Sequence, residues 1–303
     1  MENPIDAHSP NHSVINPLNS ILIPLRYQNQ VFPDGHMPQI SEVPAHFDTK
    51  GITARGPCCY HTEYSSKIRT FTSPLLEGLN VLKASHRKGV PELWTSPAWA
   101  LEMAEFVFRL SEGKEPPAII EIHPPFATSV PTVEAFLDIY AVFEHSVLGR
   151  FPNCRFLIEN RSGTKHPSEF LISTAESILG VGRALASRSI QLGIALDVAQ
   201  MFTKHYGSKC LVGPDGAELL KTILPIRDQI HTLHLWGRAR NGGAHNGGLD
   251  GLFAPDAGAQ EACLSVMRNM FNSDLERHLV VEVVNSGILA SILEDLRSAG
   301  FAC

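Results

Sequence analysis

The chain has 303 residues, of which 44% are hydrophobic and 18% are charged, and its formal net charge is −6. This composition is ordinary for a globular protein. The acidic balance and the lack of a lysine–arginine run do not favour nucleic acid as a partner. No apolar stretch approaches the roughly 18 residues of a membrane span, and no signal peptide is expected. Six cysteines without a CxxC pair predict reduced thiols in a cytoplasmic protein.

The first part of the chain gives a weak pattern. Residues 1–12 are predicted to be a flexible arm, and one domain is predicted over 13–303. Up to about residue 70, Pro, Asn and Gly interrupt short apolar runs, and strands are expected near 17–25, 43–48 and 51–57.

From about residue 97, helical spacing alternates with short β-rich runs. Strands are expected within 118–126, 155–161, 191–200, 230–237 and 278–284. Helices are expected at 98–110, 132–149, after 170, from about 216, from about 258 and at 287–300. A repeat near 40 residues predicts parallel βαβ units. Eight such strands would close an α/β (β/α)8 TIM barrel, which takes about 250 residues.

The later strands carry polar side chains on one face only. Neighbouring side chains face opposite sides of a strand, so the wholly apolar face is expected to pack under helices. The other face ends in Glu159, Asp197, His234 and Glu282 on four separate strands. Taken singly, each could be a core residue paired with a hydrogen-bond partner or an arginine. Together they predict a divalent metal site, because burying several carboxylates without a cation is costly.

These strand ends resemble the xylose isomerase-like barrel superfamily, which includes sugar isomerases, epimerases and endonuclease IV-type nucleases. The motifs are FLIENRSG, IALDVAQMF, LHLWG followed by a histidine-containing loop, and LVVEV, within 115–300. In the isomerase branch the resemblance implies that the four residues hold one Mn, Mg or Co ion. It also implies that Glu159 and Glu282 are catalytic and exchange protons with the substrate.

Two other branches remain open. In the endonuclease IV branch, His123 and His245 would be further ligands of a three-zinc phosphodiesterase site. However, Gln200 and Gly243 replace expected ligands, and the third-strand histidine is expected to be absent, with Arg55 nearby. The motifs IENRSGTKHPSEFL, LDVAQMF and HLWG also resemble multinuclear iron-dependent oxidative enzymes that modify peptide cysteines. Six ligands could then hold two metals.

Other side chains near the strand ends are candidates for substrate binding. They are Arg161, Gln200, His205, Trp236 and Asp250. Asp250 could instead orient a ligand histidine, and the glycines around it predict a mobile loop with unusual φ/ψ values.

The sequence thus predicts a metal-dependent isomerase or epimerase that transfers a proton next to a carbonyl. The expected substrate is a small polyhydroxylated molecule, and the cofactor is one divalent ion, or two, of Mn, Co, Fe or Zn. The alternatives are an iron-dependent oxidative enzyme acting on a peptide or small molecule, and a metal-dependent phosphodiesterase.

Overall fold

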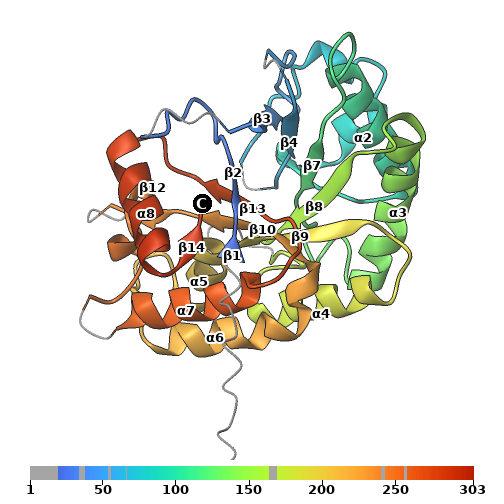
Figure 1. The fold of residues 1–303 in the computed structure, drawn as a ribbon. Coiled ribbons are helices and arrows are strands. Elements are labelled where there is room, and N and C mark those ends of the chain that lie inside the picture. Colours follow the sequence, from blue (N-terminus) through green and yellow to red (C-terminus); the bar gives the residue numbers. More distant parts are fainter. Residues whose placement is uncertain are drawn as a thin grey trace, which may run out of the picture.

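A computed structural model describes residues 20–33, 38–53, 56–65, 67–163, 169–239, 243–255 and 258–303. Its main sheet has eight parallel strands in the spatial order β2-β13-β10-β9-β8-β7-β4-β3 (Figure 1). They are β2 (Ile23–Leu25), β3 (Ser41–Ala45), β4 (Cys58–Thr62), β7 (Ile119–Ile122), β8 (Arg155–Glu159), β9 (Leu192–Asp197), β10 (Ile230–Leu235) and β13 (His278–Val281).

The sheet closes where its two edge strands meet. Arg26 follows β2, and its amide donates to the carbonyl of Ile40 (3.0 Å), while the amide of Glu42 donates to the carbonyl of Arg26 (2.9 Å). A parallel bridge joins Arg26 to Ser41 at the same place. The predicted α/β TIM barrel is therefore confirmed.

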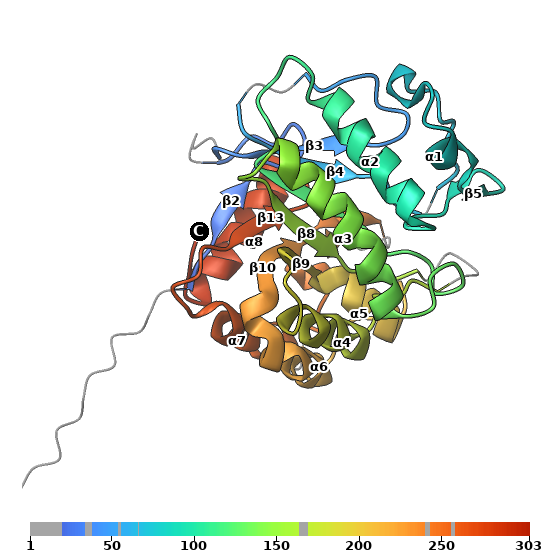
Figure 2. The ribbon, with the colours of Figure 1, turned by 90° about the vertical axis from the view of Figure 1, so that its right-hand side faces the viewer.

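Helices surround the barrel (Figures 1 and 2). They are α1 (Asn80–Ala84), α2 (Pro97–Leu110), α3 (Val133–Arg150), α4 (Ala175–Ala186), α5 (Val198–Tyr206), α6 (Asp215–Ile223), α7 (Ala259–Phe271) and α8 (Ser286–Ser298). The 3-10 turns are η1 (Pro74–Leu76), η2 (Leu224–Gln229) and η3 (Leu249–Gly251). Three short pairs complete the structure: β1 (Ser20–Ile21) with β14 (Phe301–Ala302), β5 (His86–Arg87) with β6 (Val90–Pro91), and β11 (Gly237–Arg238) with β12 (Ala244–Gly247).

The sequence located the later elements better than the early ones. All five strands expected after residue 97 are present within a few residues of their expected positions. The strand expected at 51–57 is wrong, because the strand begins at Cys58, after Gly56 and Pro57, two residue types that strands disfavour. In the connections from β2 to β3 and from β3 to β4, the described residues contain no helix.

A floor of apolar side chains fills the lower interior of the barrel. It consists of Leu25, Cys59, Ile119, Leu157, Ala195 and Val280. In five of these strands, the residue two positions further on is a histidine or an acidic residue. Because side chains two apart share a face, these polar groups form the next layer, at the carboxyl ends of the strands. This is where barrel enzymes carry their catalytic residues.

The arm predicted at 1–12 lies outside the described residues, and the single domain predicted over 13–303 stays a prediction. Within the described part of the chain, every helix is too short or too polar to cross a bilayer.

Candidate metal centre

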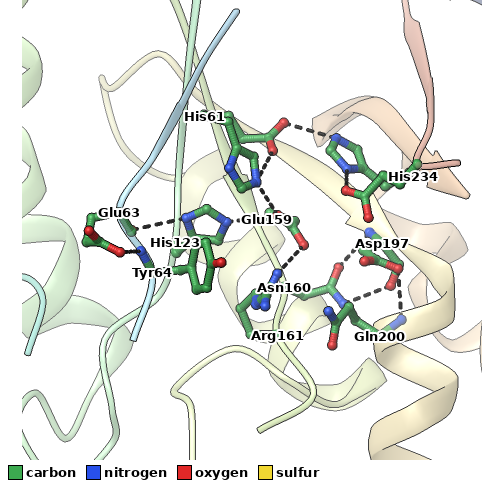
Figure 3. Close-up of polar contacts among 12 residues, drawn as sticks. His61, Glu63, Tyr64, His123, Glu159, Asn160, Arg161, Asp197, Gln200 and His234 are labelled. Atoms are coloured by element: carbon green, nitrogen blue, oxygen red, sulfur yellow. Dashed lines mark hydrogen bonds and ion pairs between the residues drawn. The ribbon is translucent and has the colours of Figure 1, made fainter. Parts of the chain in front are cut away.

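Histidines and carboxylates above the apolar floor form two overlapping clusters (Figure 3). The first ligand group contains His61, Glu121, His123 and Glu159. The second ligand group contains Glu159, His234 and Glu282. Within each group, one potential ligand atom per residue lies within 4.8 Å of the others. Glu159 therefore connects the β4–β7–β8 side of the barrel to the β10–β13 side.

Glu159 is fully buried and is contacted through both of its oxygens. Its Oε2 lies 2.9 Å from His123 Nε2 and 3.3 Å from His61 Nε2. Arg161 Nη1 donates to Oε1 at 3.1 Å. Burial opposes ionisation of Glu159, but Arg161 and then His123 outweigh it and hold the pKa well below its usual range. The carboxylate is thus charged at neutral pH.

His123 is held in the orientation expected of a metal ligand. The Nδ1 of His123 lies 3.2 Å from the carbonyl oxygen of Glu63, and the backbone carbonyl of His123 accepts from Trp94 Nε1 at 2.8 Å. Burial, with a contribution from His61, lowers the pKa of His123, so the ring is neutral at pH 7. An Nδ1–H donated to a backbone carbonyl leaves Nε2 as a free ligand atom.

His234 lies between two carboxylates. Its Nδ1 is 2.9 Å from Glu282 Oε1, and its Nε2 is 3.0 Å from Glu121 Oε2. Burial opposes protonation of His234, but Glu121 and then Glu282 outweigh it and raise its pKa well above the usual value. Without a metal, this ring therefore carries a proton on both nitrogens.

The donor set fits divalent cations. Five buried carboxylates gather here, and they are Glu42, Glu121, Glu159, Asp197 and Glu282. Burial, which is the largest cause, raises the pKa of Glu42 and of Asp197 to about 8. Glu121 Oε1 is buried without a hydrogen-bond partner and lies 3.6 Å from His61 Nε2. Several carboxylates buried together are costly, and a divalent ion at the ligand groups would compensate the charges of Glu121, Glu159 and Glu282.

Asp197, a predicted ligand, lies outside both ligand groups as the structure has them. Its Oδ1 accepts from the amide of Gln200 at 2.8 Å and caps α5, and its Oδ2 accepts from Trp236 Nε1 at 3.0 Å. The side chain of Asn160 pairs with the backbone amide and carbonyl of Asp197, both at 2.9 Å. These bonds join the ends of β8 and β9.

A cavity of about 1750 Å³ opens above the centre. The sequence-predicted residues that line it are Arg161, Gln200, Trp236, His245, Asp250 and Glu282. His245 stacks on Trp236, with ring centroids 4.4 Å apart, and its Nδ1 lies 3.1 Å from Glu282 Oε2. His205 is different, because it is exposed on α5 against Tyr206 and does not line the cavity.

Two sequence-based expectations are corrected by the structure. The third-strand histidine is present: His61 lies one residue before the end of β4 and contacts Glu159, whereas Arg55 lies outside the described residues. Because the strand is predicted at 51–57, His61 is not recognised from the sequence as the third-strand histidine. Cys59 and His61 nevertheless follow the two-residue spacing of the other strands. The unusual φ expected in the loop near Asp250 is present, but at His245 (φ 59°) and not at the glycines, since Gly247, Gly248 and Gly251 are absent from the positive-φ residues.

Comparison with known proteins gave structural matches only. No family model and no curated protein sequence matches the chain. A xylose isomerase domain protein from Planctomyces limnophilus is 12% identical, with 90% of this chain and 98% of that chain covered and a TM-score of 0.43. A xylose isomerase domain-containing protein from Salmonella typhimurium LT2 is 9% identical, with 79% and 73% covered and a TM-score of 0.39. The IOLI protein, crystallised with a zinc atom, is 13% identical, with 66% and 67% covered and a TM-score of 0.38.

Proposed function

We propose that this chain is a metal-dependent enzyme whose centre holds two divalent ions that share Glu159. We further propose that it transfers a proton next to a carbonyl of a small polyhydroxylated substrate, as a cytoplasmic isomerase or epimerase. The observation that carries the proposal is the overlap of the two ligand groups at one buried carboxylate beneath a large cavity.

Each ligand group would hold one ion. His61, Glu121, His123 and Glu159 would hold the first, and Glu159, His234 and Glu282 the second. Asp197, which the sequence predicts as a ligand, is in neither group and stays a candidate. Mn, Co, Fe and Zn all suit such ligands. Bound there, the ions would polarise a carbonyl or hydroxyl group of the substrate.

The residues of the cavity wall support a different proposal for the proton-transfer roles from the one made from the sequence. Glu282 lines the cavity, and although burial opposes its ionisation, His234 and then His245 keep its pKa below the usual range. We therefore retain Glu282 as the base. Glu159 does not line the cavity, so its role here is that of a ligand. Glu42 lines the cavity and, with a pKa raised to about 8 mainly by burial, carries a proton to donate at neutral pH.

An oxidative reaction is the second candidate. The two ligand groups contain three imidazoles alongside carboxylates, a set that suits iron. The cavity volume of about 1750 Å³ exceeds the ~300–1,000 Å³ typical of small-molecule sites, so an extended substrate such as a peptide segment would fit. The three-zinc phosphodiesterase is not proposed, because Gln200 replaces a ligand and its Oε1 accepts from the amide of Ser162 at 3.1 Å.

Elemental analysis of the purified protein, followed by two activity assays, tests the proposal. Two ions per chain, with exchange of solvent deuterium into a keto sugar or inosose by the wild type but not by Glu282→Gln, would support it. Bound iron with consumption of dioxygen, and no exchange into any member of the panel, would favour the oxidative reaction instead. A chain that binds no ion when incubated with Mn, Co, Fe(II) or Zn would contradict both.

A further inference from the structure

Arg238 is a buried cation in the wall of the cavity. Arg238 is 8% exposed and comes two residues after Trp236 in the chain. Its guanidinium lies 5.1 Å from the centre of the Trp236 ring. Among the described residues, its only hydrogen-bond acceptor is the hydroxyl of Thr203, and it forms no ion pair with a carboxylate. Burial lowers the pKa of Arg238, and Asp197 only partly opposes this effect. Within the described part of the chain, the charge therefore lacks a direct counter-ion.

The other cations that line the described part of the cavity are in different situations. The protonated ring of His61 is paired with Glu159 at 3.3 Å. Arg161 is paired with Glu159 at 3.1 Å. Lys67 and Lys209 are exposed, so water solvates them. A buried charge is stable only when it is paired or well hydrogen-bonded. Arg238 is therefore the cation of this wall that an anion in the cavity would stabilise most.

The backbone of Arg238 is held in place by close packing against glycines. A Cβ added to Gly247 or to Gly251 would lie 1.8 Å from the carbonyl oxygen of Arg238. At Gly237 an added Cβ would lie 1.8 Å from the carbonyl oxygen of Gly248. Only glycine fits at these positions, and none of the three has a positive φ. The glycine-rich motif thus fixes the position of Arg238 between β12 and η3.

We propose that Arg238 binds an anionic group of the substrate, a carboxylate or a phosphate. A guanidinium presents parallel N–H groups that match either anion. Ser208 and Lys209, from the loop after α5, line the same cavity and can add donors. Trp236 contacts both Arg238 and Asp197, so a bound anion would be one side chain away from Asp197, at the edge of the candidate centre. That the anion belongs to the substrate rests on the proposed function, whereas anion binding itself requires no metal.

Calorimetric titration of the full-length protein with inorganic phosphate and, separately, with acetate tests this proposal. Each titration is run on metal-loaded and on chelator-treated protein. Arg238→Met should weaken binding of the preferred anion by about tenfold to a hundredfold, as expected for loss of a charge-assisted hydrogen bond. The control Lys67→Met, an exposed cation of the same cavity, should change it less than about twofold. The preferred anion identifies the group as phosphate or carboxylate.

The outcomes separate this inference from the proposed function. Failure of the wild type to bind either anion, or equal binding by Arg238→Met, would overturn the subsite even if two metal ions bind. Anion binding that depends on Arg238 in a chain that binds no metal would support the subsite and contradict the proposed function. If Arg238→Met does not fold, Arg238→Lys replaces it: weaker binding of the anion supports a role for the guanidinium, and unchanged binding overturns it.

Discussion

The two sides of the candidate centre differ in the imidazoles that they offer to a metal. On the side formed by β4, β7 and β8, His61 is protonated, with a pKa raised to about 10 by neighbouring carboxylates, but His123 is neutral and its Nδ1 faces a backbone carbonyl. On the side formed by β10 and β13, the one imidazole, His234, is held between Glu121 and Glu282 and is protonated. An ion must displace one proton on either side, but only the first ligand group also offers a neutral ring. We therefore expect the first ligand group to bind its ion more tightly at neutral pH.

The largest effect should come from the residue that both sides share. Glu159→Gln removes the charge common to the two ligand groups. Both ions should therefore bind more than about 100-fold more weakly, a larger loss than is typical when a residue that only hydrogen-bonds to a ligand is replaced. Ion content after dialysis, measured by elemental analysis, checks this. Glu169→Gln, at an exposed glutamate paired with Lys204, is the matched control. Loss of only one ion would show that Glu159 is not shared.

Removing one histidine from each side tests whether the sides are separate sites. His61→Asn should weaken binding of the first ion by about 100-fold, and His234→Asn should weaken binding of the second ion by about the same factor. Each variant should then retain one ion per chain, and the ion kept by His234→Asn should be the tighter one. Titration with Co²⁺, followed by its absorption, distinguishes the two sites. If either variant loses both ions, the centre is a single cooperative site and the comparison of the two sides fails.

How much could be predicted from the sequence also differs between the sides. Glu159, Asp197, His234 and Glu282 end apolar β-rich runs, so their positions and their inward direction could be predicted from spacing. His61 lies near the end of β4, which follows Gly56 and Pro57. Because the early part of the chain is rich in Pro and Gly, the strand is predicted too early, at 51–57. The outcome shows that spacing is informative only where the strand bounds are clear.

The contacts within the layer could not be predicted from spacing on single strands. Glu121 contacts His234, which is 113 residues away, because β7 and β10 face each other across the barrel. Spacing along one strand gives the direction of a side chain but not its partner on another strand. For the same reason, the hydrogen bond to Asp197 from Trp236, which follows the next strand, could not be predicted from spacing.

Asp197 allows the predicted ligand role to be separated from the observed capping role. If Asp197 is a ligand, Asp197→Asn should weaken the second ion by about 10–100-fold and leave the first unchanged. If it is only a cap, ion affinity should stay constant and the variant should lose about 1 kcal/mol of stability at most. Metal titration and urea unfolding of the same variant decide between these roles. The capping result would remove Asp197 from the metal site.

The pH dependence of metal binding should reveal the protonated imidazole on the first side. Burial opposes protonation of His61, but Glu42 and then Glu159 raise its pKa to about 10. Below that pH a metal must displace the proton, so affinity for the first ion should rise by about tenfold per pH unit between pH 6.5 and 8.5. Competition with a chelator at three pH values measures the slope. His205→Asn, at an exposed histidine, should keep it, and a flat profile in the wild type would contradict the protonation of His61.

The smallest effect should come from a residue that supports only the second side. Gln30 is buried, and its Nε2 donates to the carbonyl oxygens of Val281 and Val283, which flank Glu282; the bond to Val283 is 2.6 Å. Gln30→Met fills similar space but removes the donor to both carbonyls, of which that of Val281 still accepts from the amide of Val283, and it removes the acceptor of the Tyr27 amide. The free energy of unfolding should therefore fall by about 2 kcal/mol. Glu282 would be held less precisely, and the second ion should bind about threefold more weakly while the first is unaffected. Gln191→Met, at an exposed glutamine, is the control. Equal weakening of both ions would mean that Gln30 acts through general stability and not through the position of Glu282.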